Sequence, residues 1–261
     1  MWHIIRAALL ICPALIYDYF AWILKYSRHP EKYPLSRRYE KSRNLIRKAN
    51  KLLKLDLHVE GLENRPEGVA CYFVNHLAAV DPLLLFEVME EPTAFLAKIE
   101  IKKMPFVGRI FTAENGMFLK RDDLKQQLKI MMKVEASLKN KECNWVIYPE
   151  GTRNKDPMNT LLTFHKGTFR PATKANVPLV PVVSYGAFRV LNMKHNYKKY
   201  PTYIKFLKPI YPEEYAGKTT DEIAALVQSR IQKEVSFVAK PLDHKRMGEL
   251  GDKYYRFNSI K

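Results

Sequence analysis

Beyond residue 54, short apolar runs alternate with amphipathic stretches, and this alternation is the feature that most constrains the fold. Runs of strand length separated by stretches of helical period indicate an α/β domain. We therefore expect an α/β fold, with a mixed sheet of about seven strands flanked by helices. The expected strands are Leu57–Glu60, Val69–Val74, Thr93–Ala97, Gly116–Leu119, Asn144–Tyr148, Leu179–Ser184 and Tyr203–Phe206. The expected helices are Pro82–Met89, Phe106–Thr112, Asp122–Leu138, Gly167–Lys174 and Thr220–Val238.

The length of the chain, 261 residues, suits one large α/β domain with an appendage. We expect an N-terminal helical segment over residues 1–55, the α/β domain over residues 56–240 and a C-terminal tail over residues 241–261. The last expected helix is preceded by Thr219-x-x-Glu222, a capping-box pattern that marks a helix start.

The most apolar segment, residues 4–24, is about as long as a membrane-spanning helix. Arg6 and Asp18 interrupt it and Pro13 lies in its middle, and charges deep in hydrocarbon are costly. We therefore favour a retained helical anchor that dips into one leaflet. A cleaved signal peptide and a soluble docking helix are the alternatives, although no clean small-x-small cleavage site follows the apolar run.

The next segment, residues 25–54, carries 11 Lys or Arg and 2 Asp or Glu, so its net charge is 11 − 2 = +9, about half of the chain's +17. Its apolar residues follow one helix face, and most of its cations fall outside that stripe. The stripe consists of Leu45, Ile46, Ala49, Leu52 and Leu53. A basic amphipathic helix beside an apolar segment is typical of an anchor on anionic lipid. A solvated helix packed on the domain is the alternative.

Nucleic acid is the other anionic partner that a net charge of +17 suggests. The sequence has no zinc-finger spacing, no RNP-like aromatic motif and no Arg-rich tail, and its basic run adjoins the apolar segment. We therefore expect an anionic membrane surface, and not nucleic acid, as the partner. This favours a protein on the cytoplasmic face of a membrane.

The three cysteines, Cys12, Cys71 and Cys143, lie far apart in apolar surroundings. With no Cys-x-x-Cys pair and no His/Cys cluster, the sequence indicates neither a disulfide framework nor a zinc site. We expect no metal and no cofactor, and a reducing cytoplasmic setting fits these cysteines.

A first polar group follows the expected strand Val69–Val74, where Asn75 and His76 precede Asp81-Pro82. Ligand sites gather at the carboxyl edge of α/β sheets. Asp81 before Pro82 is typical of a helix start, with Asp as N-cap and Pro at the first helical position. The four intervening residues let the Asp81 carboxylate meet one imidazole nitrogen, which gives a base and its orienter. Ordinary helix capping and a structural histidine are the competing interpretation.

Three further blocks are built on apolar strands, and the first two of them end in polar residues. They are Gly116–Arg121, which ends in two cations; Trp145–Arg153, which contains Tyr-Pro-Glu-Gly-Thr-Arg; and Val177–Val182, which is rich in proline and valine. Glycine permits close backbone approach, and arginine offers a planar fork to phosphate oxygens. Each block alone is a weak signal, because an arginine at a strand end is most often a surface residue and a Pro-Glu-Gly turn is usually only a turn.

Together and in this order, the four blocks resemble the glycerolipid acyltransferase family, whose best-known members are 1-acylglycerol-3-phosphate acyltransferases. The matching patterns are Asn-His-x4-Asp at 75–81, Phe-x-x-Arg at 118–121, Tyr-Pro-Glu-Gly-Thr-Arg at 148–153 and Val-Pro-Leu-Val-Pro at 177–181. With flanking strands the likeness spans roughly residues 57–210. One departure is Tyr148, which stands where many members have Phe.

The resemblance implies a role for each catalytic and phosphate-binding residue. His76 is expected to deprotonate the acceptor hydroxyl, and Asp81 to hold and polarise His76. Arg121 and Arg153 are expected to grip the acceptor phosphate, and Lys98 to add a third cation.

The resemblance also implies roles for the surroundings of these residues. Glu150, Gly151 and Thr152 are expected to shape the phosphate pocket, and Phe118 to belong to the substrate-binding set. The block Val177–Pro181 is expected to form the acyl-side wall. An α/β core with a membrane-bound N-terminal helical part is the fold that the family implies.

The implied reaction is acyl transfer from acyl-CoA or acyl-carrier protein to the sn-2 hydroxyl of lysophosphatidic acid, which forms phosphatidic acid in phospholipid biosynthesis. Glycerol 3-phosphate or another lysophospholipid is the alternative acceptor. A lipid hydrolase is a rival, although the sequence has no Gly-x-Ser-x-Gly elbow. A basic peripheral protein that only binds anionic lipid is a second rival, and it leaves the four blocks unexplained.

Overall fold

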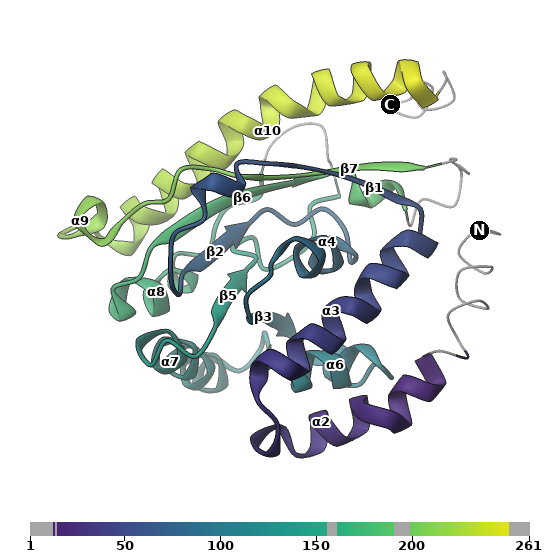
Figure 1. Ribbon diagram of the computed structural model, residues 1–261. Helices are drawn as coiled ribbons and strands as arrows, with labels where there is room; N and C mark the ends of the chain where they lie inside the picture. The colour runs from purple at the N-terminus through teal and green to yellow at the C-terminus, as the bar shows by residue number, and fades with distance from the viewer. Residues whose placement is uncertain (1–12, 14, 156–160, 191–198, 251–261) are drawn as a thin grey trace.

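A single mixed sheet forms the centre of the molecule (Figure 1). The computed structural model describes residue 13 and residues 15–155, 161–190 and 199–250, with the backbone alone for residues 237–250. The sheet has seven strands in the order β1-β7-β6-β2-β5-β3-β4. The strands are β1 (Leu55–Glu60), β2 (Cys71–Val74), β3 (Thr93–Lys98), β4 (Met117–Leu119), β5 (Asn144–Ile147), β6 (Leu179–Tyr185) and β7 (Tyr200–Phe206). Each coincides with a predicted strand, so the predicted fold class is confirmed.

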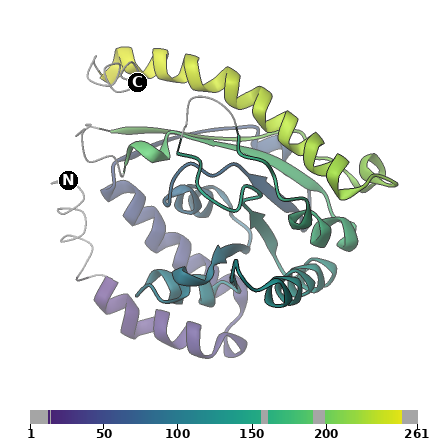
Figure 2. The same ribbon diagram turned by 180° about the vertical axis from the view of Figure 1, so that it is seen from behind.

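Helices cover both sides of this sheet (Figures 1 and 2). The α-helices are α2 (Leu24–Arg28), α3 (Leu35–Leu52), α4 (Asp81–Val88), α5 (Ile99–Lys102), α6 (Val107–Ala113), α7 (Leu124–Lys139), α8 (Arg170–Ala175), α9 (Pro212–Tyr215) and α10 (Thr220–Leu250). The other helical turns are the π-helix η1 (Tyr19–Ile23) and the 3-10 turns η2 (Pro30–Lys32), η3 (Leu62–Asn64), η4 (Lys166–Thr168) and η5 (Ala187–Arg189).

The helices differ from the prediction in extent. The single-turn helices α5 and α9 are not predicted, because four residues are too few to show a helical period. Helix α10 starts at the predicted capping box, where the Thr219 and Glu222 side chains bond each other's backbone N–H at 3.3 and 2.7 Å. It continues to Leu250, past the predicted end at Val238.

The central strands are buried on both faces, and for this reason β2 and β6 are runs of buried residues, whereas the edge strand β1 exposes His58 and Glu60. Successive side chains of β2 alternate between two cores, with Cys71 and Phe73 in one and Tyr72 and Val74 in the other. Helices α7, α8 and α10 cover the Phe73 face, and α3, α4 and α6 cover the Tyr72 face.

The strand directions bring five carboxyl ends to one edge of the sheet. Strand β2 is parallel to β5 and β6, and β3 is parallel to β5 and β4. Strand β7 is antiparallel to β6, and β1 is parallel to β7, so these two strands end at the opposite edge. The polar residues that follow β2, β3, β4 and β5 therefore converge at the first edge.

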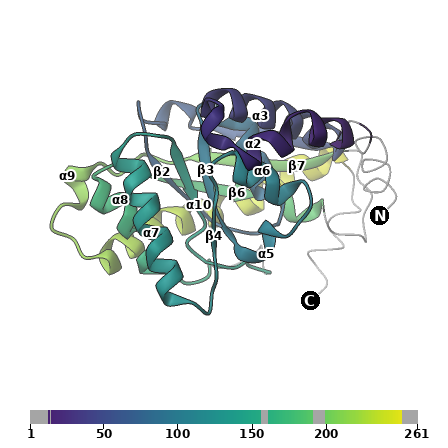
Figure 3. The same cartoon turned by 90° about the horizontal axis from the view of Figure 1, so that it is seen from below.

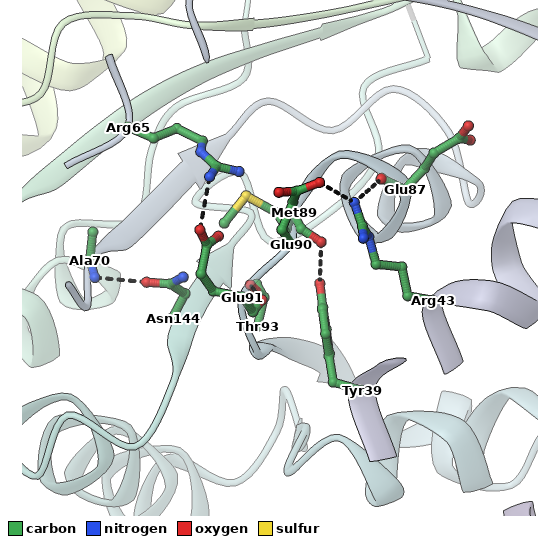
Figure 4. Close-up of polar contacts among 10 residues, drawn as sticks. All are labelled: Tyr39, Arg43, Arg65, Ala70, Glu87, Met89, Glu90, Glu91, Thr93 and Asn144. Atoms are coloured by element: carbon green, nitrogen blue, oxygen red, sulfur yellow. Dashed lines mark hydrogen bonds and ion pairs between the residues drawn. The ribbon is translucent and has the colours of Figure 1, made fainter. Parts of the chain in front are cut away.

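At the opposite edge, polar contacts fasten the turn between α4 and β3 (Figure 4). Arg43 of α3 donates to the Glu87 carbonyl at 3.1 Å and pairs with Glu90 at 3.1 Å. Arg65 pairs with Glu91 at 2.9 Å, and the Tyr39 hydroxyl donates to the Met89 carbonyl at 3.3 Å. These contacts tie α3 and the start of β3 into one unit.

The basic segment forms α3, as the periodicity predicts, and its apolar stripe packs on the domain. Leu45 and Ile46 are buried, whereas Arg47 and Lys48 are exposed. This packing agrees with the alternative of a helix docked on the domain, and it leaves the cationic face open. No helix in the described ranges has both the length and the apolarity that a bilayer crossing requires.

The apolar segment 4–24 lies partly outside the described residues, which begin at Pro13. Its second half is helical, and Trp22 and Ile23 pack in one cluster with Ile110 of α6 and Leu45 of α3. The anchor therefore stays a prediction, and the structure adds that one face of its last turns is held by protein.

A buried polar group connects α3 to the segment between α6 and β4. The Ser42 hydroxyl donates to Glu114 at 2.6 Å, and Arg38 donates to the Ala113 carbonyl and, at 3.2 Å, to Asn115 Oδ1. Burial raises the pKa of Glu114 to about 8, because the charged carboxylate is the form that loses most hydration. Glu114 therefore holds a proton in the folded state near neutral pH.

This buried carboxyl makes the stability of the fold depend on pH. Between its ordinary pKa of 4.5 and about 8, the folded chain holds a proton that the unfolded chain releases. The free energy of unfolding should therefore fall as pH rises through this window, with a slope approaching about 1.4 kcal/mol per pH unit. Glu114→Gln keeps an acceptor for Ser42 and should remove this slope in urea unfolding across the window. An unchanged slope, or an equal change in the exposed control Glu142→Gln, would contradict the assignment.

Candidate active site

His76 lies just beyond β2, at the edge where the parallel strands end. Its Nδ1 is 2.9 Å from Asp81 Oδ2, and the exposed fractions of the two side chains are 19% and 0%. The carboxylate accepts only, so Nδ1 donates to it, and in the neutral ring this leaves the lone pair on Nε2. The predicted convergence of base and orienter is present.

The Asp81 carboxylate is held by the loop that precedes it. Oδ2 also accepts the backbone N–H groups of Leu77 and Ala78, each at 2.8 Å, and Oδ1 accepts the Ser184 hydroxyl at 3.3 Å. These bonds compensate the burial of the charge. The prediction of Asp81 as N-cap is wrong: the N-cap is Val80, and Asp81 is the first helical residue, with its carboxylate turned back to the loop.

Asn75, next to His76 in the motif, fixes the end of β2 against β6. Its side-chain amide donates to the Ser184 carbonyl at 2.9 Å and accepts the Ser184 N–H at 2.8 Å. The amide thus extends the ladder between β2 and β6 by one step, and it brings Ser184 within reach of Asp81. Sequence reasoning did not identify Ser184, because a serine inside an apolar strand carries no pattern.

Glu150 braces the backbone of His76. Its Oε1 accepts the His76 N–H at 2.7 Å and its Oε2 accepts the Leu162 N–H at 2.9 Å, while the Asn154 N–H donates to the His76 carbonyl at 2.7 Å. Glu150 is only 2% exposed, and burial raises its pKa. The structure therefore gives Glu150 a positioning role, where the sequence predicted a pocket residue.

The ring of Tyr148 packs against the imidazole. The two ring centroids are 4.3 Å apart and the planes are tilted by 31°. The Tyr148 hydroxyl is buried and has no hydrogen-bond partner within the described part of the chain. Burial, and then the charge of Asp81, raise its pKa well above the ordinary value. The ring is the part of Tyr148 that contacts His76, so phenylalanine, which many family members have at this position, keeps this contact.

Gly151 makes the turn that carries the Thr-Arg pair. Its φ is +62°, a region that favours glycine, and a Cβ there would come within 2.9 Å of the His165 ring. Its carbonyl accepts a hydrogen bond from Arg121, which links the block after β4 to the block after β5. Thr152 and Arg153 follow with exposed side chains.

Two glutamines of α7 hold the segment that presents Arg121. Gln126 donates to the Phe118 carbonyl at 2.6 Å and accepts the Lys120 N–H at 3.1 Å, which covers the edge of β4. Gln127 donates to the Arg121 carbonyl at 2.8 Å. Neither glutamine was predicted, because a polar residue in the first turn of a helix is ordinary in sequence.

Two predicted site elements lie in the core instead. Phe118 is 8% exposed and its ring belongs to the core on the α4 side, so its backbone, and not its ring, contributes to the site. Leu179 and Val180 are fully buried and pair with Cys71 and Tyr72 in the first half of β6. The Val177–Pro181 block thus lies at the amino end of β6, where strand pairing explains its composition, and its expected role in an acyl-side wall stays a prediction.

The cations of the site stay accessible. Arg121 and Arg153 are exposed, and Lys98, at the end of β3, is 45% exposed and pairs with Glu100 at 3.2 Å. Because Lys98 lies opposite Leu119 in the β3–β4 register, it is close along the edge to the block that ends at Arg121. A half-buried base with a buried carboxylate partner, beside exposed cations at the carboxyl edge of an α/β sheet, is typical of an enzyme that activates a hydroxyl of an anionic substrate.

Comparison with known proteins identifies the family. The model of the Acyltransferase family matches residues 56–185, which include His76, Asp81, Arg121 and Arg153. The chain belongs to this acyltransferase family.

The relatives share one name. The 1-acyl-sn-glycerol-3-phosphate acyltransferase of Saccharomyces cerevisiae is 29% identical over 182 residues, which are 69% of this chain and 60% of the relative. The Escherichia coli protein of the same name is 26% identical over 175 residues, 66% of this chain and 69% of the relative. The chain spans 60% of the yeast relative's length and 56% of that from Cocos nucifera.

A solved structure shares the fold. The crystal structure of the 1-acyl-sn-glycerophosphate (LPA) acyltransferase PlsC from Thermotoga maritima matches with a TM-score of 0.71 and 24% sequence identity. The match covers 90% of this chain and 94% of that chain, so it extends beyond the family match at both ends.

The brace formed by Glu150 generates a prediction about stability. Glu150→Ala leaves the buried N–H groups of His76 and Leu162 without their acceptor and should lower the free energy of unfolding by about 2 kcal/mol or more. Glu150→Gln keeps one acceptor oxygen, so its free energy of unfolding should fall by less than that of Glu150→Ala. Urea unfolding followed by circular dichroism measures both variants, with the exposed Glu67→Ala as control. Equal stability of Glu150→Ala and the native chain would show that the brace contributes nothing.

Proposed function

We propose that the protein transfers a fatty acyl group from acyl-CoA or acyl-carrier protein to the sn-2 hydroxyl of lysophosphatidic acid, and so forms phosphatidic acid. The observation that carries this proposal is the 2.9 Å contact between His76 and buried Asp81, which leaves Nε2 as the base beside exposed cations. The names of the relatives support the same acceptor.

In the proposed reaction, Nε2 of His76 takes the proton of the acceptor hydroxyl while the hydroxyl oxygen attacks the thioester carbonyl carbon. Asp81 stabilises the imidazolium that forms. The tetrahedral intermediate collapses, the carbon–sulfur bond breaks, and the thiolate takes the proton from His76. The attacking group comes from the substrate, so no protein nucleophile is required. Base catalysis of this kind contributes about 10²–10⁴-fold.

The acceptor is proposed to be phosphorylated because of the cations around the base. Arg121 and Arg153 are the last residues of two successive motif blocks, and Arg121 is bonded to the backbone of Gly151. A guanidinium fork binds phosphate oxygens in two parallel hydrogen bonds and fixes the orientation of the acceptor. Orientation converts an encounter into a positioned attack.

One assay tests the proposal against its rivals. The purified chain is incubated with labelled acyl-CoA or acyl-carrier protein and a panel of acceptors, namely lysophosphatidic acid, glycerol 3-phosphate and other lysophospholipids, and products are identified by mass spectrometry. Phosphatidic acid is the expected product. Thioester cleavage without any acyl acceptor would instead indicate a hydrolase, and vesicle binding without transfer would indicate a peripheral lipid-binding protein.

Removal of the base is the sharpest test of the catalytic role. His76→Ala should lower kcat by about 10²-fold or more, because no group is left to accept the hydroxyl proton. Circular dichroism and vesicle binding should stay as in the native chain. His58→Ala is a matched control, since His58 also lies 3.2 Å from a carboxylate, that of Glu60, but on the surface. Normal acyl transfer by His76→Ala would remove His76 from the role of base.

The phosphate contact is tested by the kinetics of each substrate. Arg153→Ala should raise KM for lysophosphatidic acid about tenfold or more, because a charged hydrogen bond is lost, and leave KM for the acyl donor nearly unchanged. Lys155→Ala removes an exposed cation two residues away and serves as control. Equal increases in both KM values would argue against a phosphate clamp.

A further inference from the structure

Two segments far apart in the chain expose apolar side chains next to each other. In the N-terminal helical segment, Ile16, Tyr17 and Phe20 are 49%, 73% and 66% exposed. At the turn between α5 and α6, Met104 and Val107 are 46% and 38% exposed. We call these five side chains the apolar patch.

Aromatic contacts join the two halves of the apolar patch. The ring of Phe106, in the turn, lies 5.0 Å from the ring of Tyr19, and Tyr19 lies 5.3 Å from Phe20. Below them, Trp22 and Ile110 belong to one buried cluster. Figure 3 shows α2 beside α6 and α6 beside α5. The exposed side chains are therefore parts of one surface with a packed base.

An unusual backbone conformation shapes the turn. Phe106 has φ 61° and ψ −62°, and the Val107 N–H donates to the Pro105 carbonyl at 2.6 Å. These values define a γ-turn of positive φ, which is rare, and positive φ is especially unfavourable for a bulky residue. The turn directs Phe106 to Tyr19 and leaves Met104 and Val107, on either side of it, exposed.

The charges around the apolar patch indicate what covers it. Lys102 and Lys103 are exposed and directly precede Met104, and Lys25 and Arg28 of α2 are exposed as well. Apolar and aromatic side chains next to lysines are typical of surfaces that enter the headgroup region of an anionic bilayer. Three side chains of the patch, Ile16, Tyr17 and Phe20, also belong to the predicted N-terminal anchor, residues 4–24.

We infer that the turn between α5 and α6 is a second membrane-inserting element, which enters an anionic bilayer together with the outer face of the N-terminal helical segment. Helix α5 begins directly after Lys98, at the end of β3, so the turn is attached to the edge that carries His76. Insertion of both elements fixes that edge against the bilayer surface. The inference rests on the proposed function in one respect, which is that the acyl acceptor is a lipid.

A fluorescent label at the turn tests the inference directly. In the full chain with Cys12→Ser, Met104→Cys is labelled with an environment-sensitive dye, since Cys71 and Cys143 are buried. Leu62→Cys is the matched control, because Leu62 is 48% exposed and follows β1 at the opposite edge. Vesicles of phosphatidylcholine and phosphatidylglycerol should shift the emission at 104 to the blue, and lipid-attached quenchers should quench it, with no change at 62. An unchanged label at 104 on vesicle-bound protein would overturn the inference.

Partition measurements give a second readout. Lys102→Gln with Lys103→Gln should weaken binding to the anionic vesicles roughly tenfold or more, and should not change binding to pure phosphatidylcholine. Met104→Ser with Val107→Ser should weaken binding to both kinds of vesicle roughly tenfold. Leu62→Ser should have no effect. If the Met104/Val107 variant lost a dimer that the native chain forms, while its vesicle binding stayed unchanged, the patch would be a contact between copies. That result would overturn the inference.

Failure of this inference is distinguishable from failure of the proposed function. The vesicle experiments contain no acyl donor, so they do not depend on catalysis. Conversely, acyl transfer to detergent-dispersed lysophosphatidic acid does not require a bilayer, and the Met104/Val107 variant should retain it. If the protein showed no acyl transfer but its turn still entered vesicles, only the proposed function would be contradicted.

Discussion

The structure of the site depends on one buried carboxylate. Asp81 is fully buried at the start of α4, and its two oxygens accept from the His76 ring, two backbone N–H groups of the intervening loop and the Ser184 hydroxyl of β6. A charge without these donors would be too costly to bury. The same bonds therefore close the loop after β2, orient α4 and select the histidine tautomer, so the fold and the base are determined together.

The second constraint is the way in which His76 is held from the other side. Glu150 and Asn154, which follow β5, bond the N–H and the carbonyl of His76, and Tyr148 packs against its ring. The imidazole is thus fixed through its ring nitrogen, its ring face and its backbone. Because these contacts fix the ring before the substrate binds, Nε2 can accept a proton without any movement of the imidazole during the reaction. It also requires β2 and β5 to be neighbours, which the sheet order provides.

The fold was predictable because the central strands β2, β5 and β6 are buried on both faces, which makes them largely apolar runs that stand out in the sequence. The dyad was predictable because His76 and Asp81 lie on one short loop. The roles of Phe118 and Glu150 were not, because a motif states which residues recur and not which way each side chain points. Pairing across the sheet turns the Phe118 ring into the core. Ser184 lies far in sequence from Asp81, and Gln126, although near Phe118 in sequence, is an ordinary polar residue of a helix start, so no local pattern marks either of them.

The base and the cations are built on opposite principles, and the chemistry explains why. A base must be held in one orientation and largely shielded from solvent, and the buried carboxylate of Asp81 provides this for His76. A phosphate group must enter and leave the site, so its cations must be accessible. A buried cation would need a carboxylate as partner, and that carboxylate would compete with the phosphate for the cation. Arg121 is accordingly held by the neutral carbonyl of Gly151, and the structure gives neither Arg121 nor Arg153 an ion pair within the described ranges. Their full positive charge is therefore available to an anionic acceptor, while neutral groups, the Gly151 carbonyl and the Gln127 side chain, set where Arg121 lies.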